Sequence, residues 1–348
     1  MTDRTEESAN NFTLLRLMLA LMVVFGHFKL LQGTQYPPFP FNLADCAVDC
    51  FFVVSGFLIT LSCQRTRNVW SFYIRRVFRL YPMYVTIVLI QTVLMLALLP
   101  SGPFSAPYST LRYLAANLVM ANFLQYDIGG VLHGLINPGI NPSLWTLKIE
   151  MGFYFIVPLI LVATRRWGWG VLAAIFAASV AYTMVALHYG EVRLARQLPG
   201  QMQFFVTGIA LCLYGQRLRV HWSVSAARAV LLLACWTFLH PIPPGISPIL
   251  VAASVFSFAF CTPVVHMRRD ISYSVYLVHG PLIQTLILLG LLRDTPAWLA
   301  GIVTAVIVIS LATERLVERP GTEFGRTLSR WVAHSRTPAV ATVARLNI

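Results

Sequence analysis

Long apolar segments alternate with short polar segments along almost the whole chain. Most of the apolar segments are close to the length of about 20 residues that an α-helix needs to cross the ~30 Å hydrocarbon core of a bilayer. The pattern therefore predicts an all-α polytopic membrane protein with about ten transmembrane helices. The predicted spans are residues 12–31, 47–63, 81–99, 145–163, 169–188, 199–215, 226–240, 246–265, 271–292 and 296–314.

A further apolar segment, Leu111 to Leu124, is shorter and is interrupted by Arg112 and Asn117. If this segment does not cross the membrane, the arginine-rich loops all lie on one side together with both termini; if it crosses, the later loops face outward. Loops rich in Lys and Arg stay on the cytoplasmic side, so we predict that both termini are cytoplasmic and that residues 111–124 lie in the interface or are re-entrant. The predicted cytoplasmic set is Arg65, Arg67, Arg75, Arg76, Arg79, Arg165, Arg166, Arg217, Arg219, Arg228, Arg268, Arg269, Arg315, Arg319, Arg326, Arg330, Arg336 and Arg345.

The composition agrees with a membrane protein. Of the 348 residues, 57% are hydrophobic and 11% are charged, against about 45–50% and about 25% in soluble domains. These values exclude a soluble enzyme, a disordered chain and a fibrous repeat. The net charge of +13 would indicate nucleic-acid binding in a soluble protein, but the basic residues here flank apolar segments, so we expect no nucleic-acid partner. The first apolar segment is too long for the core of a signal peptide and predicts an uncleaved first span.

The six cysteines fall mostly inside apolar segments, where a free thiol behaves as a small hydrophobic group. Cys46 and Cys50 are four residues apart, so a disulfide between them is a minor alternative. No His–Cys cluster accompanies them, and we expect no metal site.

Five ionisable residues lie inside predicted spans: Arg16, His27, Asp49, Glu150 and His279. A charged group at this depth costs about 2.5–3.5 kcal/mol on insertion scales, so each is a candidate for function. The predicted directions of the helices place His27, Asp49 and Glu150 in the outer half of the bilayer and His279 near its middle. Arg16 lies about 16 Å below His27, because eleven residues separate them.

An imidazole beside a carboxylate is the arrangement of a general base that activates a hydroxyl. Two alternatives stay open for these groups. A buried histidine often only joins helices by a hydrogen bond, and a proton-coupled transporter uses the same side chains.

Arg75, Arg76 and Arg79 share one helical side at the predicted cytoplasmic edge of the membrane. Guanidinium groups bind phosphate oxygens in a bidentate manner, which indicates an anion-binding site. The alternative is a signal for membrane orientation or a patch for anionic lipid head groups.

Five motifs in order along the chain resemble the membrane-bound acyltransferase family 3 of bacteria, which O-acylates envelope and exported carbohydrates. Individually they are weak, but together they extend from residue 16 to about residue 320. One departure is Thr146, which stands where the family usually has Ser. The motifs are Arg16-x10-His27, Asp49-Cys-Phe-Phe-Val-Val-Ser-Gly-Phe-Leu-Ile-Thr60, Arg76-Val-Phe-Arg79 followed by Pro82, Trp145-Thr-Leu-Lys-Ile-Glu150, and Ser272-Tyr-Ser-Val-Tyr-Leu-Val-His279.

The resemblance implies an acyl-CoA donor, acetyl-CoA by default, that enters from the cytoplasm, and a carbohydrate or lipid-linked glycan acceptor at the outer side. It implies His27 as the general base, with Asp49 or Glu150 to orient the imidazole. The implied donor-binding residues are Arg16, Arg75, Arg76 and Arg79, and the implied substrate-binding residues are His279 and Trp145.

We therefore expect an O-acyltransferase of the bacterial inner membrane, with residues 1–318 as the transmembrane domain and residues 319–348 as a cytoplasmic tail. Membrane lipids are the other expected partners. A transporter or lipid flippase would predict paired discontinuous helices and repeat symmetry, which the sequence lacks. A structural scaffold would not explain five costly ionisable groups inside the spans.

Overall fold

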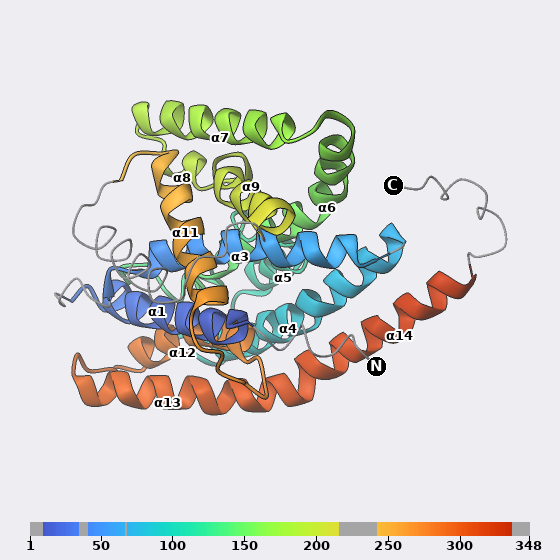
Figure 1. Cartoon of the computed structure of the whole chain (residues 1–348). Coiled ribbons are helices and arrows are strands. Elements are labelled where there is room, and N and C mark those ends of the chain that lie inside the picture. The colour runs from blue at the N-terminus through green and yellow to red at the C-terminus, as the bar shows by residue number, and fades with distance from the viewer. Residues whose placement is uncertain (1–9, 35–40, 67, 216–241, 336–348) are drawn as a thin grey trace.

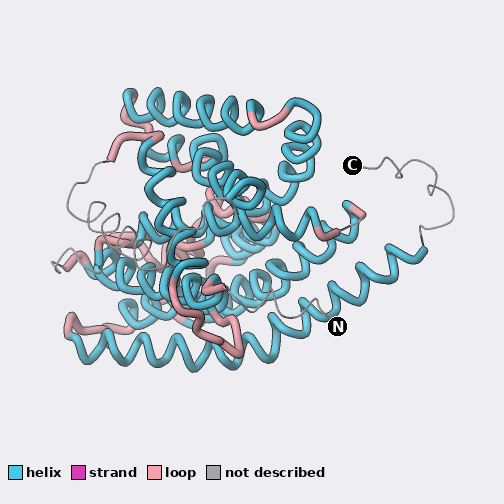
Figure 2. Tube along the Cα trace, in the orientation of Figure 1, coloured by secondary structure: helices cyan, strands magenta, loops and turns pink. Residues whose placement is uncertain are grey.

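The computed structural model describes residues 10–34, 41–66, 68–215 and 242–335, and within these ranges every regular element is a helix (Figure 2). The α-helices are α1 (Phe12–Gln32), α3 (Ala44–Gln64), α4 (Val69–Ala97), α5 (Pro107–Leu118), α6 (Leu144–Trp167), α7 (Gly170–His188), α8 (Val192–Ala195), α9 (Leu198–Tyr214), α11 (Ile246–Cys261), α12 (Ser272–Leu288), α13 (Pro296–Thr313) and α14 (Arg319–Ser335). A π-helical segment, η2 (Glu314–Glu318), joins α13 to α14.

The described part of the chain contains six helices that are long and apolar enough to cross a membrane, so the protein is a multi-pass membrane protein. They are Phe12–Gln32, Ala44–Gln64, Val69–Ala97, Leu144–Trp167, Gly170–His188 and Pro296–Ala333. Three other predicted spans form shorter helices, α9, α11 and α12, of 17, 16 and 17 residues. The predicted span 226–240 lies outside the described residues. The predicted number of about ten spans is therefore not confirmed, and the side on which the termini lie stays a prediction.

In Figure 1, α7 lies along one edge of the molecule, α13 and α14 lie along the opposite edge, and α1, α3 and α4 lie between them. Two glycines allow α3 and α9 to pack closely. A Cβ atom added to Gly56 would collide with the carbonyl oxygen of Phe205, and one added to Gly208 would collide with that of Val53. Small residues at such a crossing let helix backbones approach in a membrane.

Helix α4 is longer than the span predicted for this part of the chain. The predicted span at residues 81–99 and the arginine segment before it form one helix of 29 residues, Val69–Ala97, which continues through Pro82. The Asn68 side chain caps its first turn by accepting a hydrogen bond from Trp70 N at 2.9 Å. A proline inside a helix removes one backbone hydrogen bond and bends the helix without having to end it.

The chain after Glu318 is helical as far as Ser335, and this helix, α14, lies against the first half of α4. Ser71 Oγ donates a hydrogen bond to the Ser329 carbonyl at 2.9 Å. The rings of Phe78 and Phe324 are 5.1 Å apart, and a Cβ atom on Gly325 would collide with Phe78. The division of the chain into domains at residues 318 and 319 stays a prediction.

The first part of the interrupted apolar segment belongs to α5, which has 12 residues and begins at Pro107. At 1.5 Å per residue its length is about 18 Å, too short for a ~30 Å hydrocarbon core. It is held against α4 by hydrogen bonds from Tyr84 and Tyr81 to the carbonyls of Asn117 and Leu118, both at 2.7 Å.

Candidate active site

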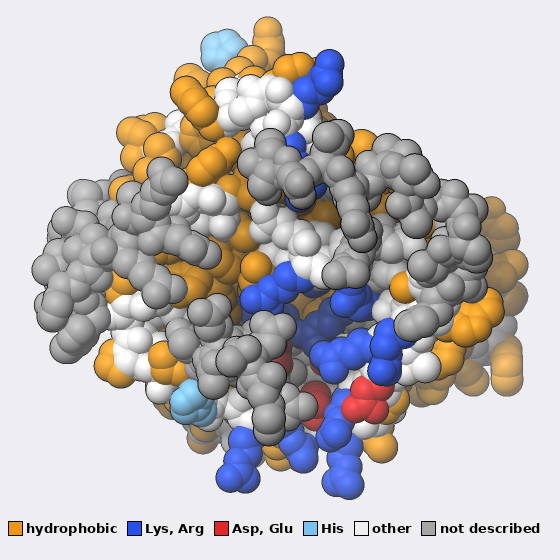
Figure 3. Space-filling model, turned by 45° about the vertical axis from the view of Figure 1, so that its right-hand side comes forward, with side chains coloured by type: hydrophobic (Ala, Val, Ile, Leu, Met, Phe, Trp, Pro, Cys, Tyr) orange, Lys and Arg blue, Asp and Glu red, His pale blue; other side chains and the backbone are white. Residues whose placement is uncertain are grey.

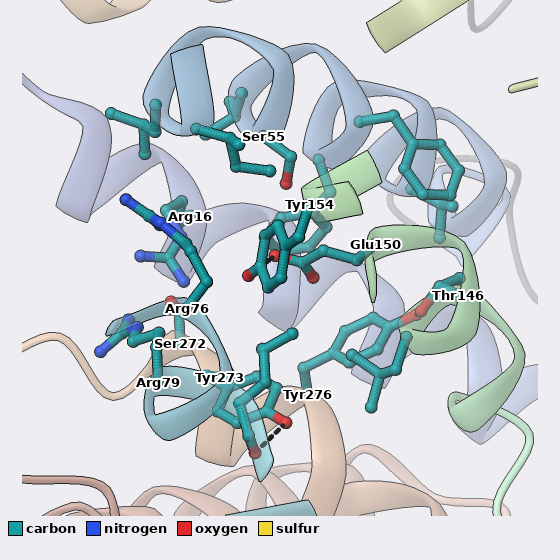
Figure 4. A pocket seen from close by; sticks show the side chains of 18 residues that line it. Arg16, Ser55, Arg76, Arg79, Thr146, Glu150, Tyr154, Ser272, Tyr273 and Tyr276 are labelled. Atoms are coloured by element: carbon teal, nitrogen blue, oxygen red, sulfur yellow. Dashed lines mark hydrogen bonds between the residues drawn. The ribbon is translucent and has the colours of Figure 1, made fainter. Parts of the chain in front are cut away.

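A cavity opens between α1, α3, α4, α6 and α12 (Figure 4). Its empty volume is about 780 Å³, which includes the open solvent at its mouth. Three arginines lie at one end in Figure 4, and Thr146 lies at the other. The polar lining residues are Arg16, Ser55, Arg76, Arg79, Thr146, Glu150, Tyr154, Ser272, Tyr273 and Tyr276.

Two of the three arginines share one carboxylate. Asp270 Oδ2 accepts a hydrogen bond from Arg16 on α1 and another from Arg79 on α4, the second at 3.0 Å. Arg79 also lies 3.8 Å from Glu318 Oε2, and the Glu318 side chain is only 2% exposed. The charges of Arg16 and Arg79 are therefore partly neutralised before any ligand binds.

Asp270 is placed by the start of α12. Its Oδ1 atom accepts hydrogen bonds from Ser272 N at 3.2 Å and from Ser272 Oγ at 2.6 Å. Burial raises the pKa of the Asp270 carboxyl, but the Arg16 and Arg79 guanidiniums and the two Ser272 hydrogen bonds lower it more, so that its pKa falls to about 2. Asp270 is thus a stable anion between two cavity arginines.

Arg76 differs from the other two cavity arginines, because none of the described carboxylates forms an ion pair with it. Its guanidinium lies 6.0 Å from the centre of the Phe72 ring and 5.9 Å from that of Tyr154. Glu150 points into the same cavity, where its Oε1 atom accepts a hydrogen bond from Tyr154 OH at 2.8 Å. Within the cavity, Arg76 therefore keeps its positive charge available to an anion.

The far end of the cavity is aromatic. Tyr276 OH and Thr146 Oγ1 are 2.9 Å apart and hydrogen-bonded, and the Phe51 ring packs edge-on against Tyr276 at 5.7 Å. The Tyr276 ring also contacts the His279 ring, 6.1 Å away and nearly perpendicular. Tyr276 thus lines the cavity and also lies next to His279.

His27 and His279 form a pair beside Tyr276. Their Nδ1 and Nε2 atoms are 2.7 Å apart, and the two rings are stacked at 5.0 Å. The side chain hydrogen-bonded to His27 is therefore a second imidazole, where the sequence predicted a carboxylate, Asp49 or Glu150.

The backbone determines the tautomers of this pair. His279 Nδ1 lies 2.9 Å from the Val275 carbonyl oxygen, which can only accept, so Nδ1 carries the proton. Nε2 of a neutral His279 is then an acceptor and receives the hydrogen bond from His27 Nδ1. This leaves His27 Nε2 unprotonated, with a lone pair that can take up a proton.

The remaining predicted site residues do not line the cavity. Arg75 hydrogen-bonds to the Thr66 hydroxyl and, at 3.2 Å, to the Ser71 carbonyl. Trp145 packs edge-on against Phe52.

Asp49 also lies away from the cavity, and the charges that act on it are Asp45 and Arg196. The reason is helical periodicity. Val48, Phe52 and Ser55 face the cavity at spacings of three and four residues, so Asp49 points to another side of α3.

The sequence analysis did not identify Asp270, Glu318, Tyr154 or Tyr276. Asp270 lies in a predicted loop and Glu318 four residues after the last predicted span, positions at which charge is ordinary. Their shared partner Arg79 is 191 residues from Asp270 and 239 residues from Glu318 in the chain.

Among the described residues, no group of three or more His, Cys, Asp or Glu side chains could hold a metal ion.

Comparison with known proteins gives a consistent result. The family model described as an acyltransferase domain matches residues 10–315. Nodulation protein 10 of Rhizobium leguminosarum bv. viciae is 27% identical over 92% of this chain and 95% of its own length. An O-acetyl transferase of Shigella phage Sf6 is 27% identical over 89% of this chain and 95% of its own length.

A third relative, the exopolysaccharide production protein ExoZ of Rhizobium meliloti, is 26% identical over 82% of this chain and 92% of its own length. No solved structure matches the chain.

Proposed function

This chain belongs to acyltransferase family 3 and is an O-acyltransferase, and we propose that it moves an acyl group, acetyl by default, from acyl-CoA to a hydroxyl of a carbohydrate. The name of one relative supports a carbohydrate acceptor, because it is an exopolysaccharide production protein. We place the reaction in the inner membrane of a bacterium, with an envelope or exported glycan, free or lipid-linked, as the acceptor.

The cavity is the proposed donor site. Acyl-CoA carries several phosphate charges at one end and an uncharged thioester at the other. Arg76, with Arg79 and Arg16 beside it, lies at one end of the cavity, and the uncharged Thr146–Tyr276 pair lies at the opposite end. In this orientation the phosphates contact the arginines, and the thioester lies at the Tyr276 end of the cavity, nearest the histidine pair.

His27 is the proposed general base. Its Nε2 atom takes the proton of the acceptor hydroxyl as the hydroxyl oxygen attacks the thioester carbon. The bond from that carbon to sulfur then breaks, and the protonated His27 returns its proton to the leaving CoA sulfur. His279 accepts the hydrogen bond of His27 Nδ1 and so orients the ring, the role that a carboxylate has in catalytic triads.

The observation that carries this proposal is the pairing of His27 with His279 beside Tyr276, which lines the cavity that also holds the arginines. A test uses membranes of a deletion strain of the source organism that are complemented with wild type or a variant and incubated with acetyl-CoA labelled in the acetyl group. The readout is alkali-labile label in the carbohydrate fraction.

His27→Ala should lower this label by about 10²–10⁴-fold, the usual contribution of a general base, at equal protein level. The matched control is His188→Ala, which removes an exposed histidine at the end of α7 and should leave the label unchanged. Transfer at the wild-type rate by His27→Ala would contradict the proposed mechanism, and unlabelled carbohydrate with wild type would contradict the donor.

A further inference from the structure

The arginines in and near the cavity differ in whether a carboxylate already neutralises their charge. Arg16 and Arg79 share Asp270, and Arg79 also faces Glu318. Among the described residues, no carboxylate forms an ion pair with Arg75, Arg76 or Arg326. A ligand with several phosphates binds by charge complementarity, so these three cations are the ones that attract it.

The packing of α14 on α4 places Arg326 level with Arg75. The two helices run in opposite directions, because Gly321 meets Pro82, Gly325 meets Phe78, and Ser329 meets Ser71. Gly325 also lies against the Ile74 carbonyl, so the residue after it is level with Arg75.

Two further observations support this position. The Arg326 side chain is exposed, and its positive charge acts on the Arg75 guanidinium together with that of Arg76. Figure 3 shows Lys and Arg side chains gathered around a hollow on this face of the molecule. Three like charges at close range repel one another, and an anion between them removes this repulsion.

We propose that Arg326, with Arg75, forms the outer part of the donor site and binds the 3′-phosphate on the adenosine end of acyl-CoA. This inference rests on the proposed function and extends it to α14, which begins four residues after the end of the family match at residue 315. In CoA, the adenosine 3′-phosphate and the thioester are at opposite ends of the molecule. When the thioester reaches the aromatic end of the cavity, the 3′-phosphate is the group farthest from it, and Arg326 is the most exposed of the three cations.

The test compares the binding of CoA with that of 3′-dephospho-CoA, which lacks only this phosphate, and needs no acceptor. The full-length protein is placed in nanodiscs of uncharged phosphatidylcholine, and the Kd of each ligand is measured by calorimetry. Arg326→Ala should raise the Kd of CoA roughly five- to tenfold, the share of one charge-assisted contact at an exposed site, and should leave the Kd of 3′-dephospho-CoA unchanged.

The matched control is Arg319→Ala, which removes an equal charge from the same helix. Arg319 is exposed and is paired with Glu323 at 2.9 Å, so the Kd of both ligands should stay as in wild type. Three outcomes overturn the inference: Arg326→Ala leaves the Kd of CoA unchanged, it raises the Kd of both ligands equally, or Arg319→Ala has the same effect. Failure of wild type to bind CoA would instead overturn the proposed donor, and the inference with it.

Discussion

The hydrogen bond between His27 and His279 makes a specific demand on the side chain at position 279. That side chain must accept a hydrogen bond from His27 Nδ1–H. His279 does so through Nε2, because its Nδ1–H donates a hydrogen bond to the Val275 carbonyl. His279→Ala should therefore lower the transfer rate by about 10²–10³-fold, since the base loses its orientation. His279→Gln, whose amide oxygen can accept the same hydrogen bond, should retain more activity than His279→Ala. Equal activity of the two variants, measured as labelled ester per unit of protein, would contradict the orienting role.

Asp270 makes the stability of the fold depend on pH in the acidic range. Its pKa of about 2 lies below the ordinary value of 3.8, so its contribution is complete above about pH 4 and is lost as the pH falls toward 2. The difference corresponds to about 2 kcal/mol. Asp270→Asn should lower the Tm of the purified protein at pH 6 and remove most of the change in Tm between pH 4 and pH 2.5. An Asp270→Asn variant with the same acid dependence as wild type would show that other groups cause it.

At the level of residues, the sequence identified single groups better than it identified their partners. Arg16, Arg76, Arg79 and Glu150 all line the cavity, because an ionisable residue in an apolar segment is visible from composition alone. The partners are set by tertiary contacts over long separations. His27 and His279 are 252 residues apart, and no local pattern of either helix indicates that their rings meet.

At the level of elements, the crossing of α3 and α9 depends on the absence of two side chains. Gly208→Ala would place a methyl group against the Val53 carbonyl and the backbone of Gly56. Backbone atoms cannot move aside as a flexible side chain can, so we expect a loss of about 1–3 kcal/mol or more. The Tm of the purified protein should fall clearly.

The matched control for this prediction is Gly301→Ala in α13, where no atom lies within 4 Å of the added Cβ. Alanine is the better helix former by about 1 kcal/mol, so Tm should stay the same or rise. A Gly208→Ala variant as stable as Gly301→Ala would contradict the close approach of the two helices.

Hydrophobic pattern predicted where helices occur more reliably than where they end. The pattern predicts a span that begins at residue 81, yet α4 begins at Val69. It predicts a tail after residue 318, and within this tail α14 is helical as far as Ser335. Both extensions have the same physical cause, because each helix packs on the other and this contact stabilises turns that polar composition does not predict.

At the level of the whole molecule, the two ends of the helix bundle differ in charge. The arginines of the cavity and of α14 lie at one end, together with the turn after Arg165 and Arg166. In the loop after α7, Arg196 is neutralised by an ion pair with Asp45 at 3.0 Å. By the positive-inside rule, this asymmetry predicts that the arginine-rich end lies in the cytoplasm.

The orientation can be tested with reporter proteins. Alkaline phosphatase, which is active only outside the cytoplasm, should be active when inserted after Tyr189, in the loop between α7 and α8, and inactive when inserted after Trp167, between α6 and α7. A green fluorescent protein at the C-terminus should fluoresce, because the positive-inside rule predicts that the arginine-rich end lies inside. Phosphatase activity after Trp167 and none after Tyr189 would show that the protein has the opposite orientation in the membrane. The arginine-lined mouth would then open away from the CoA pool, and acyl-CoA could not be the donor.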